Sequence, residues 1–588
     1  MIDEFRGYNH NTSIGSGEFY DMLNMSSEYY PVLSPRKKRR VHKDVYAMGL
    51  IEKSTIFSGT YLSRLCYVSG TSIYIGKNGY DMGLSLEREY QSRTLTSFGS
   101  YIIIMPDKKY INVVDPDDRG DIDYTWSASH VDGVPDSVSF TLCDILGAEY
   151  VADPSPTEPS SPENGQYWID TSSTPHVLKK YSSQSAMWVS ITTTYVKISR
   201  KGIGKDLKQY DGVTISGIVK SGVTDLNSSH VVWACTDDYI VVTALIDEVV
   251  TQEDSEGIIT VSRKMPIMDY VVESGNRLWG CRYGKNENGD FVNEIYASKL
   301  GDFKNWSCFM GLSTDSYYVS CGTEGQFTGA ITYFGTPIFF KERCMHKVYG
   351  DYPANFQVQQ TECNGVASGC SQSLAIIGTT LFYKSREAVC VYDGSLPVDI
   401  SSQLGVYQKS TLAKAGATNK KYYIMMQDND SKFNLFVFDV EKGVWHKESG
   451  FYTGGFCYSD GTLYCIDWDS ARIITIDSDD ETYDSAEDKV PWMVETGPIG
   501  MTLPDMKYIS RLSLRMNVEV GSSAYVRIQY DSIGTWEQVA NITATTLRSV
   551  SVPIHPRRCD HFRIRIEGEG DCKLYSMTRT IEQGSDVS

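Results

Sequence analysis

The stretch TGAITYFGTPIFFKE, residues 328–342, consists of an apolar segment, a glycine turn and an aromatic segment. Both flanks are rich in the β-branched and aromatic residues that favour strands, and glycine suits the tight turn between them. The stretch therefore predicts a β-hairpin. Three later stretches have the same layout: SQSLAIIGTTLFYKS (371–385), AKAGATNKKYYIMMQ (413–427) and TGGFCYSDGTLYCID (453–467).

The turn residues of these four hairpins recur at a nearly constant interval. They are Gly335, Gly378, Asn419 and Gly461, which gives intervals of 43, 41 and 42 residues. A repeat of about 42 residues that holds several short antiparallel strands is typical of one blade of a β-propeller. Weaker copies surround Gly70, Gly99 and Gly275. We predict an all-β fold with a β-propeller of about six blades, or seven, closed by pairing between residues 1–60 and 450–480.

The repeat is interrupted once and ends before the C-terminus. Residues 115–266 contain a proline-rich linker and then alternating apolar and polar residues between glycines, which predicts an inserted β-domain. Beyond an acidic connector, 477–492, strands of period two predict a β-sandwich, with one apolar face formed by Leu512, Leu514, Met516, Val518 and Val520. The expected division is 1–114 (N-terminal strands and first blades), 115–266 (insertion), 267–490 (remaining blades) and 491–588 (sandwich).

The composition limits the function. The formal net charge of −19 and a pI of about 5.0 argue against non-specific binding to nucleic acid. Apolar runs stay far below the roughly 18 residues that a membrane span needs, so we expect no membrane span. The 14 cysteines contain no CxxC pair, which favours reduced thiols made in a cytoplasm.

Motifs for catalysis are absent from the sequence. The chain has no glycine-rich phosphate loop, GxSxG or HExxH motif, so we expect a protein that is not an enzyme and has no metal or cofactor. Cys559 and His561 share one face of a strand, but Asp560 is expected to point to the other face. The pair is therefore interpreted as a strand edge with a buried thiol.

Two tryptophans of the insertion, Trp168 and Trp188, allow two interpretations. They could form an aromatic platform for a sugar or another protein. A small β-module also needs such residues for its core, and the core interpretation is favoured.

Three segments carry a resemblance to a known family. EIYASKLGDFKNW (294–306), NMSSEYYPVLSPRKKRR (24–40) and IRIEGEGDCKLYSM (564–577) resemble segments of the tail nozzle proteins of short-tailed bacteriophages, also called tail tubular protein B or packaged-DNA stabilisation proteins. The resemblance implies a propeller-based subunit of a homohexameric ring that extends the tail below the portal and adaptor proteins. Such a ring would retain packaged double-stranded DNA and then conduct it without specific binding, and an acidic wall suits a conduit that must not grip phosphate.

Five consecutive basic residues follow the apolar segment YYPVL: Arg36, Lys37, Lys38, Arg39 and Arg40. They lie between structured segments, whereas a nucleic-acid-binding tag usually lies in a disordered tail. We favour an inter-subunit or inter-domain clamp in which these side chains meet an acidic surface. A solvated loop and a DNA contact are the alternatives.

The sequence thus predicts a structural protein of the virion tail, made in the cytoplasm of the host bacterium, whose partners are its own copies, the portal, the adaptor and other tail proteins. The alternative is a tail protein that binds host glycans during adsorption.

Overall fold

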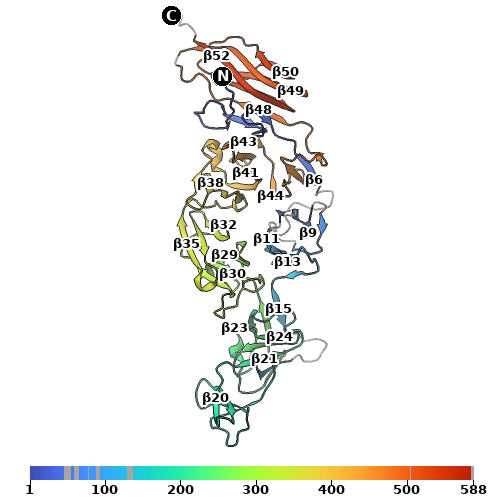
Figure 1. Ribbon diagram of the computed structural model, residues 1–588, viewed down its shortest axis with the longest axis vertical. Coiled ribbons are helices and arrows are strands. Elements are labelled where there is room, and N and C mark those ends of the chain that lie inside the picture. The colour runs from blue at the N-terminus through green and yellow to red at the C-terminus, as the bar shows by residue number, and fades with distance from the viewer. Residues whose placement is uncertain are drawn as a thin grey trace.

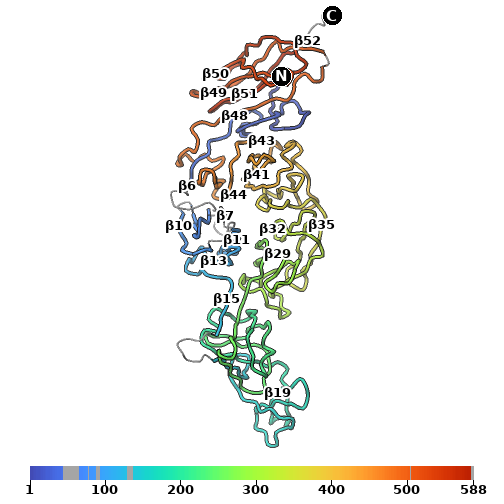
Figure 2. The backbone as a smooth tube through the Cα atoms, turned by 180° about the vertical axis from the view of Figure 1, so that it is seen from behind, coloured from blue at the N-terminus to red at the C-terminus, as the bar shows by residue number. Residues whose placement is uncertain are grey.

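The structure is a computed structural model that describes residues 1–44, 55–58, 65–76, 79–87, 93–128, 137–503 and 505–583. It consists almost entirely of strands. The described residues also form four short 3-10 helices, η1 (Thr224–Leu226), η2 (Pro353–Asn355), η3 (Ser371–Ser373) and η4 (Ser402–Lys409). The molecule is elongated, with a ring of sheets in the middle, the insertion at one end and the C-terminal domain at the other (Figure 1; Figure 2).

The predicted all-β propeller is confirmed. Most of its sheets have four antiparallel strands in sequence order, as blades do. In blade order the strands are β7 (Thr55–Ser58), β8 (Leu65–Ser69), β9 (Ser72–Ile75), β10 (Tyr80–Asp81); β11 (Thr94–Phe98), β12 (Tyr101–Met105), β13 (Lys109–Asn112), β14 (Arg119–Asp121); β28 (Tyr270–Ser274), β29 (Arg277–Lys285), β30 (Phe291–Ala297), β31 (Tyr317–Ser320); β32 (Phe327–Tyr333), β33 (Thr336–Lys341), β34 (Cys344–Tyr349), β35 (Gln357–Glu362); β36 (Ala375–Ile377), β37 (Thr380–Lys384), β38 (Val389–Tyr392), β39 (Val398–Asp399); β40 (Leu412–Ala417), β41 (Lys421–Gln427), β42 (Phe433–Asp439), β43 (Val444–Ser449); and β44 (Thr453–Ser459), β45 (Thr462–Asp467), β46 (Arg472–Ile476), completed by β6 (Arg40–Asp44) and β47 (Asp484–Ser485).

The sequence left six or seven blades open, and the described residues form seven blade sheets, six with four strands and one with five. We number them blades I to VII in the order given. Gly70 forms the turn between the second and third strands of blade I, whereas Gly99 and the later turn residues join first and second strands. The short interval between Gly70 and Gly99 therefore reflects two different turns of two adjacent blades.

Neighbouring blades share apolar walls because their middle strands are buried on both faces. Ile102 and Ile104 of β12 pack with Val68 of blade I. Ile103, which points to the opposite face, packs with Val271 of blade III. Full burial of such a side chain contributes about 1.5–3 kcal/mol to folding. A blade alone would leave one of these faces in water, so the ring must close to be stable.

The N-terminal segment closes the ring. Strand β6 pairs antiparallel with β46, with Val41 opposite Ile474 and Arg40 opposite Thr475, and its other edge pairs with β47. The last blade thus takes its fourth strand from the beginning of the chain. This confirms the predicted pairing between residues 1–60 and 450–480.

Residues before β6, which share the expected division 1–114 with the first blades, lie between blade VI and the C-terminal sheet. Strand β3 (Asp21–Leu23) pairs with β48 (Pro491–Glu495). Isolated bridges join Ile2 to Met577 and Leu33 to Leu574. The remaining short strands form two small pairs, β1 (Gly7–Tyr8) with β2 (Glu18–Phe19) and β4 (Met25–Ser26) with β5 (Ser34–Pro35).

The C-terminal domain is one hydrogen-bonded sheet in the order β3-β48-β51-β49-β50, with β52 also on β49; its further strands are β49 (Lys507–Tyr530), β50 (Glu537–Val552), β51 (Phe562–Glu569) and β52 (Cys572–Gln583). The register of β49 with β50 shifts between Val518 and Ser523. Before this point β49 pairs with β52, and after it with β51. Alternate side chains of both halves are buried in one apolar cluster.

The insertion leaves the propeller between blades II and III. Strand β14 pairs with β13, so the propeller continues to Asp121, beyond the expected boundary at residue 115. The insertion contains three sheets: β15 (Tyr124–Ser127), β27 (Thr260–Arg263), β22 (Gly212–Ser216) and β23 (Ser229–Val231); β24 (Ala234–Thr236), β25 (Tyr239–Thr243), β21 (Tyr195–Ser199), β16 (Ser137–Cys143) and β26 (Val250–Glu253); and β17 (Ala152–Ser155), β18 (Tyr167–Asp170), β19 (Val177–Ser182) and β20 (Met187–Ser190).

Proline in β6 should open the propeller. We expect Val41→Pro to destabilise the chain by about 3 kcal/mol, because β6 has strand neighbours on both sides and proline fits neither edge. Thermal unfolding measures the effect, and Val41→Thr, which keeps the backbone amide and the branched shape, is the control. Equal stability of the two variants would contradict closure by β6.

Candidate functional site

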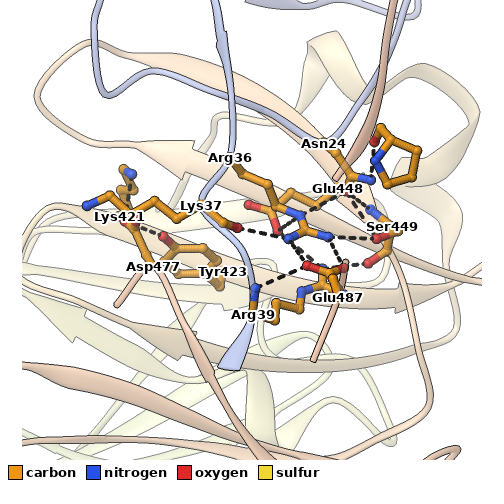
Figure 3. Close-up of polar contacts among 11 residues, drawn as sticks. Asn24, Arg36, Lys37, Arg39, Lys421, Tyr423, Glu448, Ser449, Asp477 and Glu487 are labelled. Carbon is orange, nitrogen blue, oxygen red and sulfur yellow. Dashed lines mark hydrogen bonds and ion pairs between the residues drawn. The ribbon is translucent and has the colours of Figure 1, made fainter. Parts of the chain in front are cut away.

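The basic run lies where the N-terminal segment, blade VI and the acidic connector meet (Figure 3). Arg36 and Arg39 are buried there beside Glu448 of β43 and Glu487 of the connector. We call these four residues the closure clamp. The clamp directly precedes the strand that closes the ring, so its charges fix the entry of the N-terminal segment into blade VII.

Arg36 is the centre of the clamp. Its Nη1 and Nη2 donate to the two carboxylate oxygens of Glu487, at 2.8 and 2.6 Å. Its Nε lies 3.3 Å from Glu448 Oε2 and donates to Asn24 Oδ1 at 3.0 Å. The planar fork of arginine suits such two-point binding of a carboxylate, which lysine cannot reproduce. Arg36 therefore ties β43 and the connector to its own segment.

Arg39 shares one carboxylate with Arg36. Its Nη2 donates to Glu448 Oε2 at 3.2 Å and to the carbonyl of Ser449 at 2.7 Å. Its backbone amide donates to Glu487 Oε2 at 3.1 Å, and its guanidinium lies 4.8 Å from the ring centre of Phe451. Two guanidinium groups thus depend on Glu448, and removal of this carboxylate would leave both short of negative charge.

Asn24 links the clamp to the C-terminal domain. Its Oδ1 accepts hydrogen bonds from Arg36 Nε and from the amide of Ser449, while its Nδ2 donates to the carbonyl of Pro491 at 2.7 Å. Pro491 begins β48, a strand of the C-terminal sheet. Asn24 has a φ of 54°, a left-handed conformation that asparagine tolerates better than most residues. Ring closure and domain attachment therefore share one polar network.

The other basic residues lie at the rim of the clamp. Lys37 pairs with Asp479 at 2.8 Å and with Glu28 at 3.1 Å, and Arg40 lies 3.7 Å from Glu481. Lys38 is exposed and makes no ion pair within the described part of the chain. Arg36 and Arg39 are buried inside one chain, and the acidic partners of the run come mainly from its own connector. These two arginines therefore fit the inter-domain form of the predicted clamp.

Two acids of the connector are held in their charged form. Burial alone would raise the pKa of Glu487, but the hydrogen bond and the charge of Arg36 outweigh burial and hold it below the ordinary 4.5. Burial would likewise raise the pKa of Asp477. Lys421 Nζ, 2.7 Å from Asp477 Oδ2, outweighs burial through its charge and its hydrogen bond and keeps this pKa below its usual value. The connector is thus bound to the propeller as carboxylates.

The motif of 294–306 anchors the insertion to blade III. Asn305 is fully buried; its Nδ2 donates to the carbonyl of Tyr210 at 2.8 Å and its Oδ1 accepts from the amide of Gly212 at 3.2 Å. Beside it, Asp211 and Arg263 form a buried ion pair at 2.5 Å. A side chain at Gly212 would place its Cβ 2.2 Å from the carbonyl oxygen of Ser307. Close backbone contact therefore requires glycine there.

The tryptophans of the insertion do not form an open platform. Trp168 is 5% exposed, and its Nε1 donates to the carbonyl of Ser155. Trp188 packs edge to face against it, with ring centres 5.3 Å apart, and Lys179 Nζ lies 4.8 Å from the ring centre of Trp168. Trp168 is thus covered by the small sheet β17–β20, whereas Trp188 is half-buried at its surface.

The orientation expected for Asp560 is wrong. Its Oδ2 lies 2.9 Å from His561 Nδ1, and His561 Nε2 lies 2.8 Å from the hydroxyl of Ser532. Asp560, His561 and Ser532 thus contact one another in the sequence of a serine-hydrolase triad. However, the side chain of Asp560 is 57% exposed and Ser532 is also exposed. Triad carboxylates act from a buried position. Cys559 is buried, which raises the pKa of its thiol to about 11 and leaves it unreactive at neutral pH.

Within the described ranges, no three side chains of histidine, cysteine, aspartate or glutamate gather as a metal site would require. Among the same residues, no helix has the length and hydrophobicity needed to cross a membrane.

Comparison with known proteins gives distant structural likeness only. No protein-family model and no curated protein sequence matches the chain. Solved structures that resemble it include an exo-β-1,3-galactanase from Phanerochaete chrysosporium, with 10% identity and a TM-score of 0.20 over 53% of this chain and 95% of that chain. They also include PorZ of the type-IX secretion system of Porphyromonas gingivalis, with 10% identity and a TM-score of 0.25 over 92% of this chain and 77% of that chain. A putative TolB from Agrobacterium tumefaciens is a third, with 14% identity and a TM-score of 0.19 over 39% of this chain and 85% of that chain. Likeness this low carries no argument about activity or partners.

Loss of the shared carboxylate should weaken the clamp strongly. We expect Glu448→Gln to lower the free energy of unfolding by about 3–5 kcal/mol, because two buried guanidinium groups lose a counter-charge. Urea denaturation followed by tryptophan fluorescence measures it. Lys38→Ala, in the same run but exposed, should change stability by less than about 0.5 kcal/mol; a similar loss in both variants would contradict the clamp.

The clamp should also be sensitive to acid. Because the pKa of Glu487 is lower in the folded chain, its stabilising contribution is complete above the unfolded value near 4.5 and is lost as pH falls through the folded value. The difference in Tm between the wild type and Glu487→Gln should therefore be large at neutral pH and shrink in acid. A difference that stays constant across this range would show that Glu487 is not held as a carboxylate by Arg36.

Proposed function

We propose that this protein is a structural subunit of a bacteriophage tail. Its copies assemble as a ring, six in the simplest case, between the portal and adaptor proteins and the tail tip. The ring retains packaged DNA and then conducts it during ejection. The role is mechanical and requires neither a cofactor nor an active site.

The observation that carries the proposal is what the three family-like segments do in the fold. The segment 24–40 supplies Arg36 and Arg39 to the clamp, together with Asn24, which links the clamp to the C-terminal domain. The segment 294–306 supplies Asn305 to the insertion anchor. The segment 564–577 contributes to β51 and β52, and its Leu574 is bridged to Leu33. All three segments therefore connect the propeller, the insertion or the C-terminal domain to one another. A subunit that bears mechanical load needs such firm connections between its domains.

The shape supports an axial position. The insertion and the C-terminal domain lie at opposite ends of the propeller (Figure 1; Figure 2), so one subunit offers different surfaces to components above and below it. A head-to-tail ring of such subunits closes on itself and leaves both ends for other proteins.

The charge supports conduction without binding. With a formal net charge of −19, the chain as a whole repels phosphate. Two of the five residues in its strongest basic run, Arg36 and Arg39, are buried and paired inside the fold, and are therefore withdrawn from contact with DNA.

Assembly and DNA binding test the proposal together. In sedimentation and negative-stain images, we expect rings with six times the 65.9 kDa chain mass, either alone or with the portal and adaptor of the same phage. Gel-shift assays at physiological salt should show binding to duplex DNA weaker than roughly 10⁻⁴ M, the weak limit for non-specific DNA-binding proteins. A chain that stays monomeric with those partners, or that binds duplex tightly, would contradict the proposal.

Glycan binding during adsorption is the second candidate. Its expected platform is closed, because Trp168 is buried. A cleft between the insertion and blade III, lined by hydroxyl groups and aromatic rings, favours it.

A further inference from the structure

A cleft of about 560 Å³ lies between the insertion and blade III. Strands β22, β23 and β27 form one side, and β30, β31 and the loop between them form the other. The volume is in the range of ligand sites, which often lie at domain interfaces. The anchor of Asn305 adjoins the cleft, since Gly212, Trp306 and Ser307 line it, and this fixes its two sides relative to each other.

The insertion contributes hydroxyl groups in a regular row. Thr214 is directly opposite Ser229 on one neighbouring strand and Ser262 on the other. Residues directly opposite each other share a face of the sheet, at the strand spacing of about 4.8 Å. The hydroxyls of Thr214 and Ser229 are 3.3 Å apart. All three line the cleft.

The row continues onto the open face of the same sheet. Thr125 pairs with Ser262, and Ser127 and Ser216 both pair with Thr260, so the register places four more hydroxyls on this face. The residues between them point to the buried core of the insertion, Val213, Ile215 and Val261 among them. The face therefore offers seven hydroxyls and no charged group in these positions.

Blade III contributes aromatic rings. Phe309 and Tyr318 are 53% and 56% exposed and meet edge to face, with ring centres 5.6 Å apart. Buried Trp306 lies behind them in the lining. Large rings left in water beside a polar cleft present an apolar surface that a ligand can cover.

The charges of the lining do not favour an ionic ligand. Glu294 accepts a hydrogen bond from Tyr296 at 2.6 Å, and Glu287 pairs with Lys108 at 2.7 Å, so both carboxylates are engaged. Lys264 is the third charged residue of the lining. One lysine beside two acids gives neither a phosphate site nor a strongly acidic one.

We propose that this cleft and the hydroxyl-bearing face bind a neutral oligosaccharide. Hydroxyls that both donate and accept match the hydroxyls of a sugar, and the rings of Phe309 and Tyr318 cover the apolar C–H face of one sugar unit. Because the face extends beyond the cleft, a chain of several units fits better than a single sugar. The inference does not depend on assembly into a ring.

Saturation-transfer NMR and calorimetry of the full chain test this with maltohexaose, cellohexaose and chitohexaose. At least one should bind. Two variants, Tyr318→Ala and Thr214→Val, should weaken that binding about tenfold, equivalent to about 1.4 kcal/mol. Thr214→Val keeps the side-chain shape and the strand preference, so it separates loss of the hydroxyl from misfolding. Phe334→Ala removes an aromatic ring that is 68% exposed at the first turn of blade IV, and it should have no effect.

Three results would overturn the proposal. One is the absence of binding by all three sugars. Another is binding that Tyr318→Ala and Thr214→Val leave unchanged. The third is a Tyr318→Ala variant that alters sedimentation of the chain while no sugar binds, which would assign the cleft to a second copy of the protein.

Discussion

The structure depends on closure of a ring of sheets by a strand from the opposite end of the chain. Each blade needs an apolar neighbour on both sides, so an open ring would expose the walls of blades I and VII, including Tyr67 and Tyr464. Pairing of β6 with β46 holds these walls together. The buried Arg36 and Arg39 fix the segment that leads into β6, which explains why strong charges stand in a buried position at this point.

Much of the fold can be predicted from the sequence, because the residues that favour strands and tight turns act locally along the chain. Four hairpins at a constant interval suffice to predict the blades, and the break in that interval predicts the insertion. The sequence left the blade count between six and seven because Gly70 occupies a different turn from Gly99. Val520, expected in the apolar face of its strand, is 91% exposed, because Gly521 with a φ of 87° and a shift in register interrupt the alternation.

For the candidate site, the sequence predicted the basic side of the clamp but not its partners. The basic run indicated a clamp, but its partners were not assigned, although the connector 477–492 carries the matching acids. Complementary charge in two distant segments was the available signal. Asn305 stood in a recognised motif, yet only the fold brings it to Tyr210 and Gly212. The hydroxyl row needs strand register, which sequence does not supply for strands as distant as β22 and β27.

Closure, domain attachment and the proposed mechanical role therefore meet in one short segment, residues 24–44. Hydrogen exchange of the native chain tests this most directly, because it reports the stability of each strand separately. The account predicts that amides of β6 (Arg40–Asp44) are protected as strongly as those of β46 (Arg472–Ile476) and exchange only with opening of the propeller. Fast exchange of β6 beside a fully protected β46 would contradict it.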